Sequence, residues 1–166
     1  MTFRTMRRHR QQLSEPESIE LLKNGTSAVL GVNGDDGYPY TVPINYVWYE
    51  GKIYLHCAKS GYKLDALRRS DKVSMTVIAQ EQIVPQKLTT YYRSVILFGR
   101  ARILTDAQEI IEAAQLLGRK YSTDAPAVDQ EIRKDIDRLC CIEITIEHLS
   151  GKTAIEWVDP KSSRDL

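Results

Sequence analysis

The sequence predicts an α+β fold whose core is a mostly antiparallel β-barrel. Several β-branched, apolar segments are joined by tight turns, which is typical of antiparallel strands. The helical segments cluster at the start, middle and end of the chain, whereas a parallel sheet would need them between successive strands. With 166 residues, the chain is expected to form one domain over residues 1–166, with a basic arm at 1–12 and a tail at 151–166.

The first helix is predicted from a capping box. Residues 14–17 have the Ser-x-x-Glu spacing with a proline in the first turn, and Asn24-Gly25 supplies a stop. A β-branched strand is expected at 26–32 and a turn at 33–37. The glycines around this turn loosely suggest a phosphate loop, but its two aspartates would repel a phosphate. We therefore interpret it as a turn.

A hairpin is predicted next. Residues 38–49 are rich in Tyr, Val, Thr and Trp, and Glu50-Gly51 turns the chain back into a strand at 52–57. Proline donates no backbone N–H, so Pro43 is expected at a sheet edge or a bulge. Gaps of this kind leave neighbouring backbone groups free to meet a ligand.

The second half continues with long strands and two amphipathic helices. In the strand at 72–79, Val73, Met75 and Val77 alternate with more polar positions and are expected to face the core. Thr105-x-x-Gln108 is expected to be a capping box that opens one helix, and Pro126 is expected to begin another. Each helix carries an apolar stripe, which we interpret as core. The other expected elements are a helix at 63–69, a loop at 80–88, a strand at 89–104 with a bend or bulge at Gly99, a helix stripe at Val128, Ile132, Ile136 and Leu139, and a closing strand at 141–146.

Composition excludes several classes of protein. The net charge of +1 gives no strong field toward nucleic acid or membrane, and no apolar run approaches bilayer length. Cys57, Cys140 and Cys141 are odd in number and two are adjacent, so neither a disulfide framework nor a CxxC motif is available. His9 and His148 show no ligand spacing. We expect a reduced, cytoplasmic protein without a metal.

The segment from Tyr54 to Ser70 carries the strongest local signal for a ligand. An apolar strand ends in a loop with Lys59, Ser60, Gly61 and Lys63, and a short helix follows. Hydroxyl, ammonium and free backbone N–H groups then converge at a helix start, which suits a phosphate. The alternative, a hairpin end followed by a solvated basic turn, is equally compatible with this segment alone.

Four motifs in order carry a resemblance to a known family. They are Tyr38-x-x-Thr-Val-Pro-Ile-Asn-Tyr46, Gly51-x-Ile-Tyr-x-His-Cys-Ala58, Gly61-Tyr-Lys63 and Tyr92-Arg-Ser-Val-Ile-x-Phe-Gly-x-Ala101. Over roughly residues 6–150 the chain resembles the pyridoxamine 5′-phosphate oxidase-like FMN-binding split barrels. Within them it is most similar to the group that contains the 5-nitroimidazole-resistance flavoproteins.

The resemblance implies a six-stranded split β-barrel with flanking helices, and a homodimer with FMN at the subunit interface. Lys63 corresponds to the basic residue that pairs with the phosphate, and Trp157 to a C-terminal aromatic from the partner subunit. The implied cofactor contacts are Val42, Pro43, Ile44, Asn45, Tyr46, His56, Cys57, Ala58, Lys63 and Ser94. Tyr62 replaces an arginine of the oxidases, and their arginine-rich C-terminal signature is missing, so oxidation of pyridoxamine phosphate is not expected.

The resemblance also implies an activity. We expect an FMN-dependent oxidoreductase that transfers electrons from a donor such as NAD(P)H, through the flavin, to a small, electron-poor acceptor such as a nitro compound. His56 is the candidate catalytic proton carrier, although a role as a cofactor contact is favoured over catalysis. The alternative is a non-catalytic module that binds flavin, F420 or haem. A third, weaker hypothesis is a regulatory protein whose basic arm recruits a nucleic acid. Under the other two hypotheses we expect no binding to nucleic acid.

Overall fold

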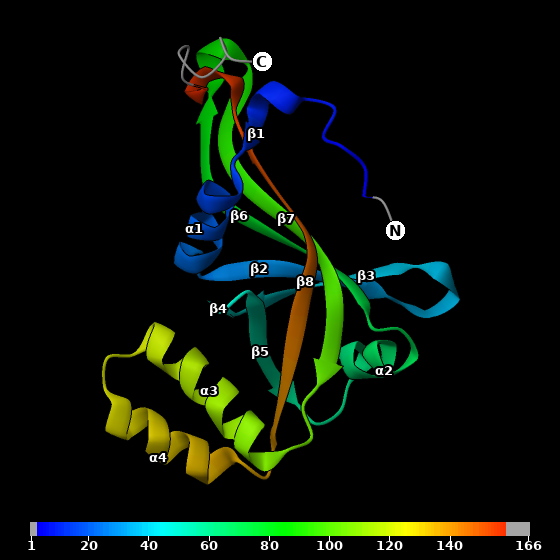
Figure 1. Cartoon of the computed structure of the whole chain (residues 1–166), viewed down its shortest axis with the longest axis vertical. Coiled ribbons are helices and arrows are strands. Elements are labelled where there is room, and N and C mark those ends of the chain that lie inside the picture. Colours follow the sequence, from blue (N-terminus) through cyan, green and yellow to red (C-terminus); the bar gives the residue numbers. More distant parts are fainter. Residues whose placement is uncertain (1–2, 159–166) are drawn as a thin grey trace.

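A computed structural model describes residues 3–158 as a strongly curled antiparallel sheet with helices around it (Figure 1). The strand order is β3-β2-β6-β7-β8-β5-β4, and β1 pairs with β8. This confirms the predicted α+β barrel. The long strands are β2 (Ser27–Asn33), β3 (Pro39–Asn45), β5 (Lys52–Ala58), β6 (Lys72–Val84), β7 (Thr89–Ile103) and β8 (Leu139–Thr153). The short ones are β1 (Gln12–Leu13) and β4 (Val47–Tyr49).

Four α-helices surround the sheet. The pair α3 and α4 packs beside β5 at one end of the molecule, α2 lies on the opposite side of that end, and α1 lies against the other half (Figure 1). Their bounds are α1 (Glu15–Asn24), α2 (Tyr62–Arg69), α3 (Ala107–Tyr121) and α4 (Ala125–Asp135). None of the helices described is long and apolar enough to cross a membrane.

The predicted hairpin over 38–57 is wrong in its first strand. β3 pairs with β2, and only the three-residue β4 pairs with β5. Because β3 and β4 lie at opposite ends of the strand order, Tyr46 carries the chain from one sheet edge to the other. Pro43 lies on the edge strand β3, as its missing N–H requires.

Three boundaries also differ from the prediction. The expected loop at 80–88 is largely strand, because β6 continues past a bulge near Ile78 and pairs with β7 up to Val84 and Thr89. The closing strand β8 runs from Leu139 to Thr153, well beyond residue 146. Asp106, and not Thr105, caps α3, since its carboxylate accepts hydrogen bonds from Gln108 and Glu109 N–H.

Other local predictions are confirmed. The capping box of α1 forms between Ser14 and Glu17. The register of β7 against β8 shifts at Gly99, where an added Cβ would collide with the Thr145 carbonyl. The barrel interior is filled by alternating strand residues, and the largest fully buried side chains are Leu22, Leu30, Tyr46, Ile53, Leu55, Leu64, Met75, Val77, Val95, Leu97, Ile142 and Ile144.

The corner at Tyr46 is fastened by two residues at the end of α3. The Tyr46 hydroxyl donates to the Leu22 carbonyl (2.8 Å), and its N–H donates to the Tyr121 hydroxyl (3.2 Å). Its carbonyl accepts from Lys120 Nζ (2.9 Å), which also donates to the Gly25 carbonyl. Lys120 lies 4.2 Å from the Tyr46 ring centroid, and burial lowers the pKa of this ammonium. We call this set of contacts the Tyr46 clamp.

Tyr121→Phe tests the Tyr46 clamp. The Tyr121 hydroxyl lies 2.7 Å from the Thr26 carbonyl and 2.9 Å from the Tyr46 carbonyl, and it accepts the Tyr46 N–H. Its removal leaves the partly buried Tyr46 N–H without a partner, so the free energy of unfolding should fall by about 1–2 kcal/mol. Tyr38→Phe, at a side chain that is 75% exposed, is the control. Equal stability of both variants in urea unfolding would contradict the role of the clamp.

Candidate functional site

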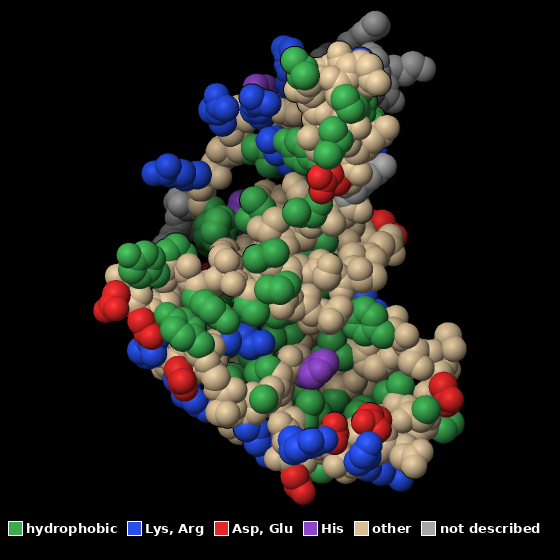
Figure 2. All heavy atoms as spheres, turned by 180° about the vertical axis from the view of Figure 1, so that it is seen from behind, with side chains coloured by type: hydrophobic (Ala, Val, Ile, Leu, Met, Phe, Trp, Pro, Cys, Tyr) green, Lys and Arg blue, Asp and Glu red, His purple; other side chains and the backbone are tan. Residues whose placement is uncertain are grey.

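A hollow lies between the helix pair α3–α4 and the strand β5. It has a volume of about 500 Å³, within the range of small-molecule sites, and we call it the α3–β5 groove. Figure 2 shows this side of the molecule from behind, with apolar side chains and an exposed histidine in its lower half. The lining residues are Asn45, His56, Ala114, Leu117, Gly118, Tyr121, Ser122, Val128, Glu131, Ile132, Asp135 and Leu139.

The alternation of β5 directs His56 into this groove. Ile53 and Leu55 are fully buried in the barrel, so the intervening positions face outward toward α3. His56 is exposed, whereas Cys57 packs against the barrel core. These two neighbours therefore point to opposite faces of β5. Within the described part of the chain, no hydrogen bond to the His56 imidazole is found, so its ring is available to a ligand.

Asn45 reaches the same groove from β3. Its position on the strand faces away from the barrel interior, and its Nδ2 donates to the Thr26 carbonyl at 3.0 Å. This bond fixes the amide and leaves Oδ1 as a free acceptor. The sequence-predicted contacts Asn45 and His56, which belong to two different strands, therefore meet in one place.

Helix α3 forms a firm wall because it is held at both ends. At its start, Arg102 pairs with Glu109 through two bonds of 2.9 Å and also reaches Glu143 on β8. Burial alone raises the pKa of Glu143, but hydrogen bonds from Lys52 and the charge of Arg102 outweigh it and hold the pKa below its ordinary value. At its end, α3 carries the Tyr46 clamp.

A second group of predicted residues lies at the carboxyl end of β5. Lys63 is in the first turn of α2, where Gly61 has φ +130° and provides no side-chain cap. Among residues 3–158, Lys63 forms no ion pair, while its charge acts on the nearby Cys57 thiol. A free ammonium and uncapped backbone N–H groups thus lie together, as an anion site requires. Ala58 is exposed at this strand end.

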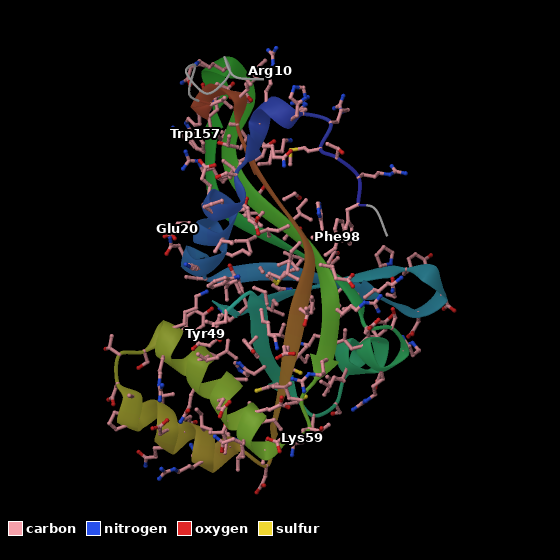
Figure 3. The ribbon with its side chains drawn as sticks, in the orientation of Figure 1. Arg10, Glu20, Tyr49, Lys59, Phe98 and Trp157 are labelled. Atoms are coloured by element: carbon pink, nitrogen blue, oxygen red, sulfur yellow. The ribbon has the colours of Figure 1, made fainter. Side chains whose placement is uncertain are left out.

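Ser94 lies elsewhere. It is on the outward face of β7, opposite Ile78 and Lys152, on a sheet face that also exposes Ile96 and Phe98. Trp157 packs near Tyr91, at the end of the molecule opposite Lys59 (Figure 3). The predicted residues therefore do not converge within one chain.

The remaining predicted contacts are on β3 and at its end. Val42 and Ile44 are half-buried and pack against the barrel core, and Pro43 faces outward. The Tyr46 side chain is fully buried, and its backbone groups are engaged in the clamp. These positions supply the frame beside the α3–β5 groove.

Sequence reasoning missed the helical wall of the groove. Val128 and Ile132 follow core spacing, but α4 has no fully buried residue and part of its stripe lines the groove. The prediction of Ile136 and Leu139 in the same helical stripe is wrong, because α4 ends at Asp135 and Leu139 begins β8. The available signal was Gly118 on α3, which lets Val128 approach so closely that an added Cβ would collide with it. In the region described, no group of three or more His, Cys, Asp or Glu side chains is arranged to hold a metal.

Comparison with known proteins identifies the family. The family model for pyridoxamine 5′-phosphate oxidase matches residues 14–153. No curated protein sequence matches the chain. Among solved structures, a Bacteroides thetaiotaomicron protein provisionally named a 5-nitroimidazole antibiotic resistance protein is 21% identical with a TM-score of 0.71, and 86% of each chain is covered.

Two further structures share the fold. The FAD and haem binding protein from Mycobacterium smegmatis is 20% identical with a TM-score of 0.73, covering 92% of this chain and 78% of that one. An FAD-binding protein from Mesorhizobium loti is 22% identical with a TM-score of 0.61, covering 87% and 97%. At these identities the likeness establishes the fold.

Cys57 should be an unreactive thiol despite its place at the strand end. Burial raises its pKa to about 11, which the charge of Lys63 only partly opposes. At about pH 8 the thiolate fraction, and hence the rate of alkylation, should be roughly 100-fold below that of a free cysteine. Iodoacetamide labelling read by mass spectrometry measures this rate, with the urea-unfolded protein as control. Labelling of native Cys57 as fast as in urea would contradict the prediction.

Proposed function

The chain belongs to the pyridoxamine 5′-phosphate oxidase-like family, and from this premise we propose that it is an FMN-binding oxidoreductase. The proposal rests on one observation. The carboxyl end of β5 carries an exposed histidine on the 500 Å³ groove, and the loop after it leads to a lysine at the start of α2 that forms no ion pair among the described residues. The proposed acceptor is a small, electron-poor molecule such as a nitro compound, with NAD(P)H as donor.

The residues at the start of α2 fit a flavin phosphate. Lys63 brings a positive charge, and the backbone N–H groups of Tyr62 and Lys63 have no side-chain cap. Gly61 has a backbone conformation that side chains rarely adopt, which keeps this turn open. A phosphate dianion needs both charge and several donors, and these groups supply them.

A bound flavin supplies hydride and electron transfer. The chain's own residues then have three tasks. His56, exposed on the groove, donates or accepts a proton as the substrate changes charge. Asn45 orients the substrate through its free Oδ1, and the apolar wall of α3 and α4 excludes water.

We also propose a homodimer with FMN at the interface. Ser94 lies on the outward face of β7, and Trp157 lies at the end of one chain opposite Lys59, so a second copy would have to bring this aromatic to the start of α2 (Figure 3). The sheet face around Ser94 exposes Val29, Ile78, Ile96 and Phe98, each by at least 41%, which supports coverage by a partner. The three free cysteines support a cytoplasmic location.

A cofactor-binding role without turnover is the second candidate. The Mycobacterium smegmatis relative binds FAD and haem, and the free imidazole of His56 faces an apolar groove, which is the kind of ligand that haem iron takes. A Soret band and no oxidation of NAD(P)H would favour this role over the oxidoreductase.

Lys63→Ala tests the phosphate site. The variant should bind FMN at least about tenfold more weakly, because a charge-assisted contact to a phosphate is lost. Riboflavin, which lacks the phosphate, should bind both proteins equally. Quenching of flavin fluorescence measures both affinities.

Lys72→Ala, which removes an exposed lysine at the start of β6, is the matched control and should bind FMN normally. If Lys63→Ala retains full FMN affinity, or weakens riboflavin as much as FMN, the phosphate does not lie at the start of α2. Stronger binding of FAD than of FMN would replace FMN as the proposed cofactor.

Ile96→Glu tests the dimer. Ile96 is 41% exposed at the centre of the apolar sheet face, so a charge there should dissociate the proposed dimer at micromolar concentration. Tyr49→Glu, at a similarly exposed side chain (44%) on the edge strand β4, should leave the dimer intact. Analytical ultracentrifugation measures the mass. A wild-type monomer, or an Ile96→Glu protein that remains dimeric, would contradict the proposal.

A further inference from the structure

The charged carboxylate residues that line the α3–β5 groove have no lysine or arginine beside them in the described lining. Glu131 and Asp135 of α4 contribute two carboxylates, and among the residues described as lining the groove there is no lysine or arginine. Asn45 adds an acceptor oxygen, because its amide nitrogen is already bonded to the Thr26 carbonyl. The groove thus offers two carboxylates and an amide oxygen as acceptors, beside His56 and Ser122, which can also donate.

The cations nearest to these carboxylates leave their charge largely available. Glu131 lies 3.5 Å from Lys134, and Asp135 pairs with Arg138, each one turn along α4. The cationic partners are 68% and 76% exposed, and exposed pairs of this type are weak because water screens them. Neither Lys134 nor Arg138 is among the residues that line the groove, whereas both carboxylate residues are.

The rest of the lining is mostly apolar. Leu117, Val128, Ile132 and Leu139 form one wall, and the Tyr121 ring, 45% exposed, lies at the edge. Lys120 Nζ already lies 5.7 Å from the centroid of this ring, so a ligand's positive charge has the carboxylates and not the ring as its partner. A planar apolar body with a positively charged end would therefore satisfy both parts of the surface.

From this arrangement we propose that the α3–β5 groove binds a planar aromatic cation, such as an amidine or a protonated aromatic amine. The aromatic body packs between the α3–α4 wall and His56, and the charged N–H groups donate to Glu131, Asp135 and Asn45. An aromatic carboxylate of the same shape is disfavoured by repulsion. The binding preference for such a cation does not depend on the proposed function. The further statement that this cation is the substrate class rests on the proposed oxidoreductase.

Benzamidine and benzoate form a matched probe pair, since both are planar and differ in charge. Full-length protein as purified should bind benzamidine at least about tenfold more tightly than benzoate in isothermal titration. The double variant Glu131→Gln, Asp135→Asn should narrow the ratio to about threefold or less. Nuclear Overhauser contacts from benzamidine to the methyl groups of Leu117, Val128 and Ile132 locate the probe in the groove.

The control variant Asp36→Asn, Glu81→Gln changes the net charge equally at exposed positions outside the groove and should keep the full preference. Benzoate binding as tightly as benzamidine, or a preference that the groove variant does not reduce, would overturn the inference. Flavin content is measured on the same samples. Flavin without the cation preference rejects this inference alone, whereas the preference without flavin rejects the proposed function alone.

Discussion

The closure of the barrel at Tyr46 is the constraint on which the rest of the structure depends. The chain leaves one sheet edge and enters the other within a single residue, so the backbone groups there cannot join a strand ladder. Buried peptide groups without partners are costly, and Lys120 and Tyr121 supply the missing bonds from the end of α3. The same contacts that close the barrel therefore fix the helix that forms one wall of the groove.

The two faces of β5 then divide the chemistry. Inward positions build the core and leave Cys57 as a packed thiol with a raised pKa, while His56 faces the groove opposite α3. The strand ends in a glycine turn with a free lysine, at the end of the molecule away from Trp157 (Figure 3). The proposed phosphate site and proton carrier thus come from this strand and the helix that follows it, and the apolar wall comes from α3 and α4. The proposed second copy would supply the aromatic Trp157, which one chain holds at the end opposite Lys59.

Much of the fold was predictable because its signals are local. Each of these signals spans only a few residues: the capping box at Ser14, the alternation around Met75 and the bulge at Gly99. The break between β3 and β4 at Tyr46 was not predictable, because β-forming residues lie on both sides of it. Only the strand order shows that β3 and β4 belong to opposite edges of the sheet. The groove was missed for a related reason. The stripe on α4 has core spacing, but whether a peripheral helix buries its stripe depends on contacts distant in sequence.

The central proposal is that this family member binds a flavin whose phosphate contacts Lys63, with His56 exchanging a proton with the substrate. The absorption spectrum of freshly purified protein, with the released cofactor identified by mass, tests it most directly. The account predicts flavin bands and the mass of FMN. A Soret band without flavin, or a colourless protein that takes up no flavin when it is supplied, would contradict it.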